Sequence, residues 1–355
     1  MKKTLTAMAT LVIGFSGVQA DFPSFPICTH QGYQWLPDVS GNIVVWQDFR
    51  NGFSANPDVY GKDLSTGEEF AICTDESMQS NVAISGSTVV WQDESTLYKT
   101  VRGKNISTGA AITFGTHYGG ELLTPAADGN LVVFEDKWRD GSGDLHRDVF
   151  AKDVTQGVAF QVCGNDTMQS TPDVSGDIIV WYDQWSDSSG VYYPRIYAKD
   201  LASGDVFPIC MNNTVQANPA VSGNTVVWMD TRNGNYDIYG YDISTGTEFP
   251  ICTDPGYQFA PAISGNLVVW EDSRNTSKDI YGYDLLTGRE FAICTDEGRQ
   301  ALPAISGELV VWEDERSGTA DIYGAYVPEP SMACLLLLGG LTLLRRKHQP
   351  WLIVS

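Results

Sequence analysis

The sequence predicts an all-β protein, a single seven-bladed β-propeller with four antiparallel strands per blade. A unit recurs along the chain every 42 to 47 residues, a period typical of propeller blades. Each unit contains an apolar run that ends in an aromatic residue, with an aspartate two positions later. Strand and turn patterns fill every unit, and other periodicities are confined to the two ends of the chain.

Seven aromatic anchors define the repeat. They are Trp46, Trp91, Phe134, Trp181, Trp228, Trp270 and Trp312. The aspartates that follow them are Asp48, Asp93, Asp136, Asp183, Asp230, Asp272 and Asp314. The strand before each anchor is apolar on both faces, so we expect it to lie between neighbouring blades.

One unit shows all four strands. Residues 261–264 form the first expected strand, Gly265-Asn266 forms a tight turn, and residues 267–272 form the second strand. The third strand covers 279–285. A turn at Gly288, where glycine permits a positive φ, leads into the fourth strand at 289–295.

The order of strands also predicts how the ring closes. An outer strand at residues 25–29 precedes every complete unit, whereas the last unit ends at residue 326 without an outer strand. We expect the N-terminal strand to complete the last blade, because closure removes the free edges of an open sheet.

Residues 1–20 have the pattern of a secretory signal peptide, with Lys2 and Lys3, an apolar stretch and a small-x-small ending at Ala20. The expected propeller spans residues 21–327. A tail at 328–347 and an extension at 348–355 follow. The tail contains a short apolar segment, and its marker residues are Pro328, Glu329, Pro330, Arg345 and Arg346.

This tail resembles a PEP-CTERM sorting signal. The resemblance implies an exosortase-type sorting enzyme as partner, transient membrane anchoring through a transmembrane helix in the tail, and removal of the tail. It also implies delivery to the outer surface or extracellular matrix of a Gram-negative-type bacterium rich in exopolysaccharide. The extension at 348–355 departs from the family, which usually ends soon after the basic cluster, so cleavage of the tail stays open.

The stretch from Asp230 to Tyr239 reads Asp-x-Arg-Asn-Gly, then Asp-Ile-Tyr. It resembles the repeats of TolB-type propellers and of propeller-bearing microbial surface proteins, and the likeness covers residues 25–326. It implies the fold and leaves the function open, because propellers host many chemistries.

The chain is strongly acidic, with a formal net charge of −22. The two terminal segments hold five cations and one anion, so the expected mature part is more acidic still. A surface of this kind repels nucleic acid and anionic lipid, which excludes nucleic-acid binding as the main role.

Six of the seven cysteines occupy the same place in the outer strand of different units. They are Cys28, Cys73, Cys163, Cys210, Cys252 and Cys294, and Cys334 lies in the tail. Sheets pack about 10 Å apart, whereas a disulfide needs Cα atoms about 4.4–6.8 Å apart. We therefore predict buried, inert thiols rather than disulfides or metal ligands.

Three polar positions also recur. The first is an arginine four residues after the anchor, at Arg50, Arg232, Arg274 and Arg316. The second is an aspartate before the third strand, at Asp58, Asp148, Asp237, Asp279 and Asp321. We expect the arginine to be held between two aspartates. The alternative is bound calcium, although the spacing differs from an EF-hand, and no other cofactor is expected.

The third recurring position is a glutamine before the first strand, at Gln34, Gln79, Gln169, Gln216, Gln258 and Gln300. We expect it to form a hydrogen bond to the backbone of a neighbouring blade. The alternative is a polar ring at the mouth of the central channel.

Two units depart from the repeat, because the connection from the second to the third strand is longest after Phe134 and after Trp181. We expect exposed loops there. They carry Trp138, Arg139, His146, Arg147, Trp185, Tyr192, Tyr193 and Arg195. Aromatic rings beside arginines suit stacking on sugar rings and hydrogen bonding to hydroxyls. The alternative is that these aromatics cover one another or the blade edge.

Three function classes remain open. The favoured hypothesis is a non-catalytic surface module that binds exopolysaccharide or another surface polymer. The others are a polysaccharide lyase or hydrolase with its site on the same face, and a propeller that binds a surface protein. Four histidines, His30, His117, His146 and His348, show no catalytic spacing. We therefore lean against catalysis and assign no catalytic residue.

Overall fold

The computed structural model describes residues 22–328, apart from 53–55, 95–97, 116–119, 165–166 and 187–191. The predicted signal peptide lies outside the described residues, as does the predicted tail from Glu329 onward. The signals for secretion and sorting therefore stay predictions. Within the described ranges, no helix is long and apolar enough to cross a membrane.

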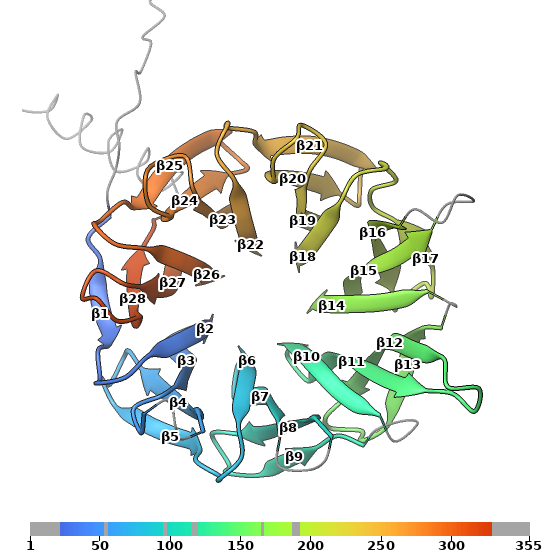
Figure 1. Cartoon of the computed structure of the whole chain (residues 1–355), viewed down its shortest axis with the longest axis horizontal. Helices are drawn as coiled ribbons and strands as arrows, with labels where there is room; N and C mark the ends of the chain where they lie inside the picture. Colours follow the sequence, from blue (N-terminus) through green and yellow to red (C-terminus); the bar gives the residue numbers. More distant parts are fainter. Residues whose placement is uncertain are drawn as a thin grey trace, which may run out of the picture.

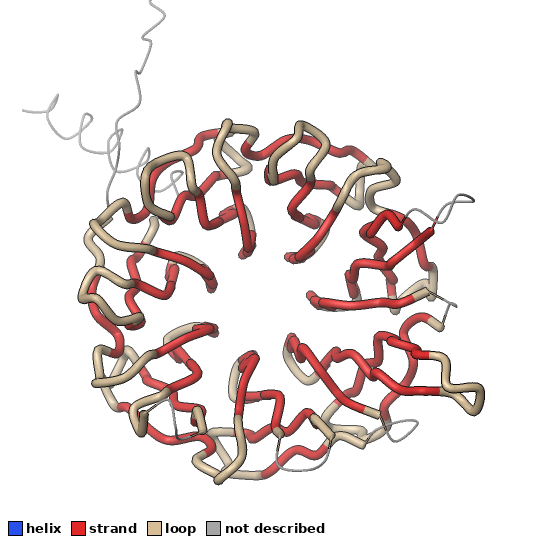
Figure 2. Tube along the Cα trace, viewed as in Figure 1, coloured by secondary structure: helices blue, strands red, loops and turns tan. Residues whose placement is uncertain are grey.

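A closed ring of seven β-sheets makes up the described structure (Figure 1). Every sheet has four strands, and neighbouring strands run antiparallel. Figure 2 shows strands and loops throughout the described part of the chain. The predicted all-β, seven-bladed propeller is confirmed.

The first four blades follow the chain from the inner strand outward. Blade one contains β2 (Gln34–Ser40), β3 (Ile43–Asp48), β4 (Asp58–Asp63) and β5 (Glu69–Cys73). Blade two contains β6 (Gln79–Ser85), β7 (Thr88–Asp93), β8 (Thr100–Asn105) and β9 (Ala111–Thr113). Blade three contains β10 (Glu121–Asp128), β11 (Leu131–Arg139), β12 (Leu145–Asp153) and β13 (Ala159–Cys163). Blade four contains β14 (Met168–Ser175), β15 (Ile178–Ser186), β16 (Tyr192–Asp200) and β17 (Val206–Pro208).

The last three blades include the one that closes the ring. Blade five contains β18 (Gln216–Ser222), β19 (Thr225–Asp230), β20 (Asp237–Asp242) and β21 (Thr247–Cys252). Blade six contains β22 (Gln258–Ser264), β23 (Leu267–Asp272), β24 (Asp279–Asp284) and β25 (Arg289–Cys294). Blade seven contains β26 (Gln300–Ser306), β27 (Leu309–Asp314), β28 (Asp321–Tyr326) and β1 (Phe25–Cys28).

The N-terminal strand completes blade seven, as predicted. β1 pairs antiparallel with β28, and Phe25 lies opposite Gly324. The side chain of Ile27 is buried and packs against Gly324, where an added Cβ would lie 2.9 Å from Ile27 Cδ1. Glycine at this position therefore leaves the space that the closing strand fills.

The strands of blade six lie close to their predicted ranges. β23 and β24 begin where expected, at Leu267 and Asp279, but β22 begins earlier than expected, at Gln258. Its pairing with β23 shifts register between Phe259 and Ala262. A β-bulge breaks the alternation of side chains, which is why the pattern did not reveal the start of this strand.

The same bulge recurs in all seven inner strands, each of which holds one non-glycine residue with φ between 42° and 51°. These residues are Leu36, Asn81, Thr124, Thr171, Asn218, Ala260 and Leu302. Left-handed backbone is unfavourable for the leucine, threonine and alanine residues among them, so neighbouring groups have to hold it. Glu313 of blade seven accepts a 2.8 Å hydrogen bond from Leu36 N, and Glu135 of blade three accepts one of 2.8 Å from Thr171 N.

Each aromatic anchor packs against the preceding blade. Trp228 of blade five clusters with Val180 and Ile196 of blade four. Trp46 of blade one clusters with Leu309 of blade seven, together with Ile27 of the closing strand. All seven anchors are buried, and burial of a large apolar side chain stabilises a fold by about 1.5–3 kcal/mol. The core is therefore a set of interfaces between blades.

A ring of short hydrogen bonds links the inner turns of all seven blades. Gly86 N donates to Ser40 Oγ of the preceding blade at 2.9 Å, and Gly41 N donates to Ser306 Oγ at 3.0 Å, which joins blade seven to blade one. In blade three an aspartate replaces the serine, and Asp128 accepts from Gly176 N at 2.6 Å. The remaining blades repeat the serine–glycine bond.

The inner strands line a central channel with a volume of about 570 Å³. Asp38 and Asp173 lie in its wall, and Asp38 accepts hydrogen bonds from Ile84 N (2.7 Å) and Val39 N (2.8 Å). Burial raises the pKa of both carboxyl groups to about 6, although these backbone hydrogen bonds act in the opposite direction. The other five blades carry alanine at the same place, at Ala83, Ala126, Ala220, Ala262 and Ala304.

We predict that these two aspartates make stability depend on pH. Their folded pKa of about 6 lies above the ordinary value of 3.8. The stability linked to them is therefore complete below pH of about 4 and is lost as the pH rises through about 6. Replacing both residues together, Asp38→Ala and Asp173→Ala, should reduce this loss. Denaturant unfolding at a series of pH values measures it, and an equal pH dependence in variant and wild type would contradict the assignment.

Candidate functional site

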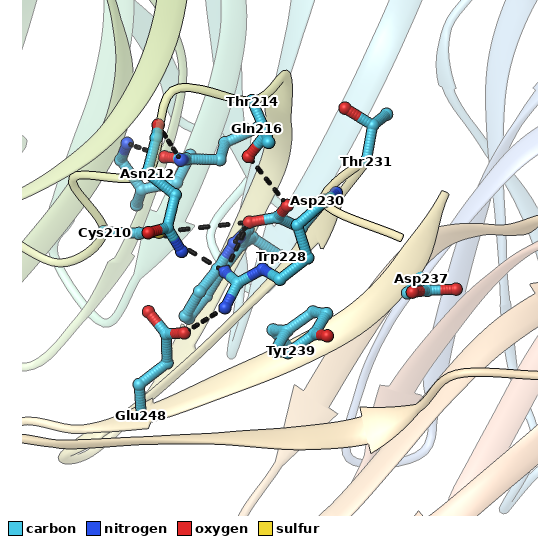
Figure 3. A network of polar contacts seen from close by, with 12 residues as sticks. Cys210, Asn212, Thr214, Gln216, Trp228, Asp230, Thr231, Asp237, Tyr239 and Glu248 are labelled. Carbon is cyan, nitrogen blue, oxygen red and sulfur yellow. Dashed lines mark hydrogen bonds and ion pairs between the residues drawn. The ribbon is translucent and has the colours of Figure 1, made fainter. Parts of the chain in front are cut away.

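The repeated aspartate, which is buried, forms an ion pair with the partly exposed arginine beside the anchor, as Figure 3 shows for blade five. Asp230 Oδ2 accepts from Trp228 Nε1 at 3.2 Å and from Arg232 Nη2 at 2.5 Å. The guanidinium lies 3.7 Å from the ring centroid of Tyr239. Burial alone would lower the pKa of Arg232, but the bonds to Asp230 and Glu248 outweigh it and raise the pKa.

The second partner of the arginine differs from the prediction. Arg232 pairs with Glu248 of the outer strand β21 rather than with Asp237. Asp237 accepts a 2.6 Å hydrogen bond from Asn233 instead. The third strand places Asp237 opposite Asp230 in the register, and an asparagine in the connecting loop satisfies it without adding a charge.

The six cysteines in the described range are free and buried, as predicted. Burial raises the pKa of Cys28, Cys210 and Cys294 to about 12. These thiols therefore stay protonated near neutral pH, and a protonated thiol is a poor nucleophile and metal ligand.

Three clusters of cysteine, histidine and carboxylate groups could in principle hold a metal ion. In blade six the cluster consists of Cys252, Asp254 and Glu290. Arg274 Nη1 lies 2.5 Å from each of the two carboxylates, and its Nη2 lies 3.1 Å from Cys252 Sγ. A guanidinium thus already supplies the positive charge that calcium would supply.

The other two clusters contain an arginine as well. Arg50 pairs with Glu69 at 2.8 Å beside Cys28 and His30 in blade one. Arg102 lies 3.3 Å from Asp75 and 3.5 Å from Asp93 in blade two. Blade two lacks the usual arginine after the anchor, and Arg102 of β8 approaches the same aspartate from the third strand.

The recurring glutamines do not form a polar ring at the channel mouth, because all six are fully buried. Gln216 accepts a 3.2 Å hydrogen bond from Ile196 N of the preceding blade, and its Nε2 donates to Asn212 O at 3.0 Å. Gln169 accepts from Val149 N in the same way. The predicted hydrogen bond between blades is confirmed for these two glutamines.

The two long connections are not loops along their whole length, which corrects the sequence prediction. The extra residues that the structure describes extend the strands instead, so β11–β12 and β15–β16 are long hairpins, and the end of the β11–β12 hairpin reaches beyond the ring (Figure 1). Trp138 lies opposite His146 in the first hairpin, and Trp185 lies opposite Tyr193 in the second. We call these hairpins the two arms.

The arm of blade three carries a stacked pair of rings. Trp138 and His146 lie 4.3 Å apart with an interplanar angle of 13°. Trp138 Nε1 donates to Asp148 Oδ2 at 3.1 Å, and His146 Nε2 lies 3.3 Å from Asp140 Oδ2. Hydrogen bonding to the Ser142 side chain and nearby backbone lowers the pKa of Asp140 to about 2. Both rings are partly exposed.

The three candidate arginines lie in different surroundings. Arg139 is exposed near the tip of its arm and donates to Gly143 O at 2.8 Å. Arg147 is partly buried, 3.4 Å from Glu135. Arg195 is buried and donates to Asn213 Oδ1 at 3.0 Å. Only Arg139 among these three is exposed to solvent.

The structure describes only some of the remaining candidate residues. Tyr193 is partly exposed on the second arm. Trp185 and Tyr192 belong to the paired strands of that arm, but their side chains lie outside what the structure describes. His117 falls within residues 116–119, which are also outside the described residues. The aromatic surface of the second arm therefore stays a prediction.

One aromatic cluster was missed by the sequence analysis. In blade six, Tyr257 and Phe259 flank the buried Gln258, and their rings lie 5.9 Å apart at an interplanar angle of 6°. Blade one repeats the pattern with Tyr33 and Trp35 around its own glutamine, the two rings 5.5 Å apart. The available signal was an aromatic residue on each side of this glutamine in two of the seven units.

Comparison with known proteins supports the fold. No family model matches the chain, and no curated sequence is similar to it. A puromycin hydrolase aligns at 13% identity and a TM-score of 0.63, over 86% of this chain and 55% of that chain. The Pyrococcus horikoshii acylaminoacyl peptidase aligns at 15% identity and 0.63, over 82% and 51%. This chain spans about half the length of these two proteins.

Two other structures align over nearly their whole length. The β-propeller domain of the Trilobed protease from Pyrococcus furiosus aligns at 12% identity and a TM-score of 0.64, over 83% of this chain and 95% of that chain. Oligogalacturonate lyase from Vibrio parahaemolyticus aligns at 12% and 0.62, over 88% and 96%. The protease domain has an open velcro topology, whereas here β1 closes the ring.

These similarities define the class as β-propellers and leave the activity open, because this fold hosts hydrolase, lyase and binding functions. TolB from Acinetobacter baumannii also aligns, at 17% identity over 71% of this chain and 63% of that chain. Its TM-score of 0.48 is too low to support an argument.

We predict that the arginines of the two arms differ in what their removal does to stability. Arg195→Ala should lower the free energy of unfolding by about 1–3 kcal/mol, because it leaves buried polar groups without a partner. Arg139→Ala should change it by less than about 0.5 kcal/mol, because its side chain is exposed. Denaturant unfolding of both variants provides the comparison, and equal effects would show that the two environments are not as described.

Proposed function

We propose that this propeller is a non-catalytic binding module for exopolysaccharide or another surface polymer. The stacked Trp138–His146 pair carries the proposal. The two rings are flat and partly exposed, and the exposed Arg139 is the next residue after Trp138 in β11. A flat aromatic surface stacks on the C–H face of a sugar ring, and a neighbouring guanidinium donates to its hydroxyls.

The position of the arms also supports the proposal. They belong to neighbouring blades, three and four, whose second and third strands have 9 residues instead of the 6 found in the other blades. The arm of blade three extends outward from the ring (Figure 1). A scaffold repeat has no packing reason to lengthen one hairpin beyond the ring. Trp185, Tyr192 and Tyr193 on the second arm would extend the same surface along a polymer chain.

Delivery to the outer cell surface is part of the proposal and depends on sequence patterns alone. The predicted signal peptide, the Pro-Glu-Pro tail and the exosortase-type partner are consistent with one another. The acidic charge of −22 suits a soluble extracellular protein. An exopolysaccharide matrix would place the proposed ligand where the propeller is delivered.

Binding is favoured over catalysis because the ionisable groups of the arms are engaged in structural contacts. His146 faces Asp140, Arg147 faces Glu135, and Arg195 bonds Asn213. The lyase or hydrolase alternative would need such groups to converge on one substrate bond. A protein partner on the same arms is the third possibility, and the experiment below separates all three.

A glycan array probed with purified residues 21–327 tests the proposal. We expect retention on at least one polysaccharide without turnover, and Trp138→Ala and Trp185→Ala should each weaken it about tenfold, or about 1.4 kcal/mol. Phe160→Ala is the control, because this phenylalanine is 39% exposed on the outer strand β13, where it pairs with Ala151, six residues from the start of β12 at Leu145, and it is not one of the candidate binding residues.

Four results would contradict the proposal. Ultraviolet absorbance from new unsaturated sugar ends would indicate a lyase, and new reducing ends would indicate a hydrolase. Full binding by both tryptophan variants would remove the arms from the binding surface. An absence of retention on every glycan would favour the protein-binding alternative.

A further inference from the structure

Blade six carries an aromatic surface that is separate from the arms. Tyr257 and Phe259 have nearly parallel rings, and Tyr236 lies 5.6 Å from Phe259 between ring centroids. Phe259 and Tyr236 pack against the core cluster between blades five and six. Tyr257 is 51% exposed, so about half of this residue contributes to the surface.

Charged groups lie beside Phe259 and on the neighbouring connection. Lys278 Nζ lies 4.8 Å from the centroid of Phe259 and pairs with the buried Glu271. Arg299 of the neighbouring connection lies 3.0 Å from Glu315 and 3.5 Å from the buried Glu313. Glu271 also acts electrostatically on Arg299, which joins the two ion-pair groups across blades six and seven.

These residues lie on one face of the ring. Tyr257 belongs to the connection before β22, and Lys278 belongs to the connection between β23 and β24. Lys278 O accepts a 2.8 Å hydrogen bond from Gln300 N of blade seven. Ser273 N likewise donates to Tyr257 O at 2.9 Å, so backbone hydrogen bonds fix the loops that present the rings.

We propose that this surface is a second glycan subsite, which takes an uncharged pyranose ring. Tyr257, whose ring is supported by stacking on Phe259, presents its exposed face to the C–H face of the sugar. The exposed carboxylate of Glu315 accepts hydrogen bonds from sugar hydroxyls, and Lys278 donates to them. This proposal rests on the proposed function in one respect, that the ligand is a glycan. The subsite shares no residue with the arms.

The electrostatics select an uncharged sugar over an acidic one. Both cations at the surface, Lys278 and Arg299, are already paired with carboxylates. Glu271, Glu313 and Glu315 outnumber them, and the whole chain has a net charge of −22. A sugar carboxylate would meet repulsion here without a cation left to neutralise it.

Conformation also favours binding. The rings are already stacked and held by the loop hydrogen bonds, so little side-chain freedom remains to be lost when a ligand binds. The equivalent positions in blades two and four hold Met78 with Ser80 and Met168 with Ser170. The aromatic pair is therefore not a requirement of the fold.

Affinity electrophoresis tests the subsite, with residues 21–327 run through gels that contain dextran, laminarin or galactomannan. Polygalacturonate is the acidic comparison. Because stacking recognises the C–H face of a pyranose rather than one linkage, we expect retardation by at least one neutral polysaccharide. Tyr257→Ala should weaken this retardation about 3- to 10-fold.

Tyr98→Ala is the matched control, because Tyr98 is 57% exposed between β7 and β8 of blade two. It should leave retardation unchanged. Equal retardation of wild type and Tyr257→Ala, retardation by polygalacturonate alone, or no retardation by any neutral polysaccharide would each overturn the subsite. Trp138→Ala in the same gels separates this outcome from failure of the arms.

Discussion

The pairing of β1 with β28 is the constraint on which the rest of the structure depends. A propeller blade buries both faces of its sheet only when it has a neighbour on each side, and a ring provides this for every blade. Ile27 of β1 lies in the same cluster as Trp46, the anchor of blade one. Lys62 Nζ of blade one also donates to Ile27 O at 2.7 Å. The closing strand thus holds two blades together.

The fold could be predicted from the sequence because packing between blades imposes the same residues seven times. The buried anchor and its aspartate keep the same spacing in every blade, even where the anchor is Phe134 instead of tryptophan. The bulge in each inner strand could not be predicted, because residues as different as Leu36, Thr171 and Ala260 adopt the same left-handed conformation. The bulge arises from the pairing register with the neighbouring strand, and this register cannot be read from the residue types.

The candidate site was predictable only in part. The lengths of the connections identified blades three and four as the ones that depart from the repeat, but length alone could not show that extra residues pair as strands. Trp138 and His146 face each other for that reason. The Tyr257–Phe259 surface was missed because the connections of blade six have the lengths that are common in the repeat, and only the residue types differ. A search for insertions cannot detect a substitution in a repeat whose length is unchanged.

The recurring polar residues and the departures from the repeat have different physical roles. Asp230 and Arg232 are engaged on several sides by hydrogen bonds, an ion pair and a ring, and such groups have little capacity left for a ligand. Trp138 and Tyr257 keep exposed ring surface, and neither residue type is shared by all blades. In this propeller the shared residues stabilise the ring, and the surfaces proposed for binding come from residues that only some blades carry.

The most direct measurement of ring closure compares two isoleucines at the same place in the outer strand. Ile27 lies in β1 and Ile251 in β21, and both are buried. If β1 is an integral strand of blade seven, Ile27→Ala and Ile251→Ala should each lower the free energy of unfolding by about 2–5 kcal/mol. If Ile251→Ala lowers the free energy of unfolding as expected but Ile27→Ala lowers it by less than about 0.5 kcal/mol, the ring is not closed by β1.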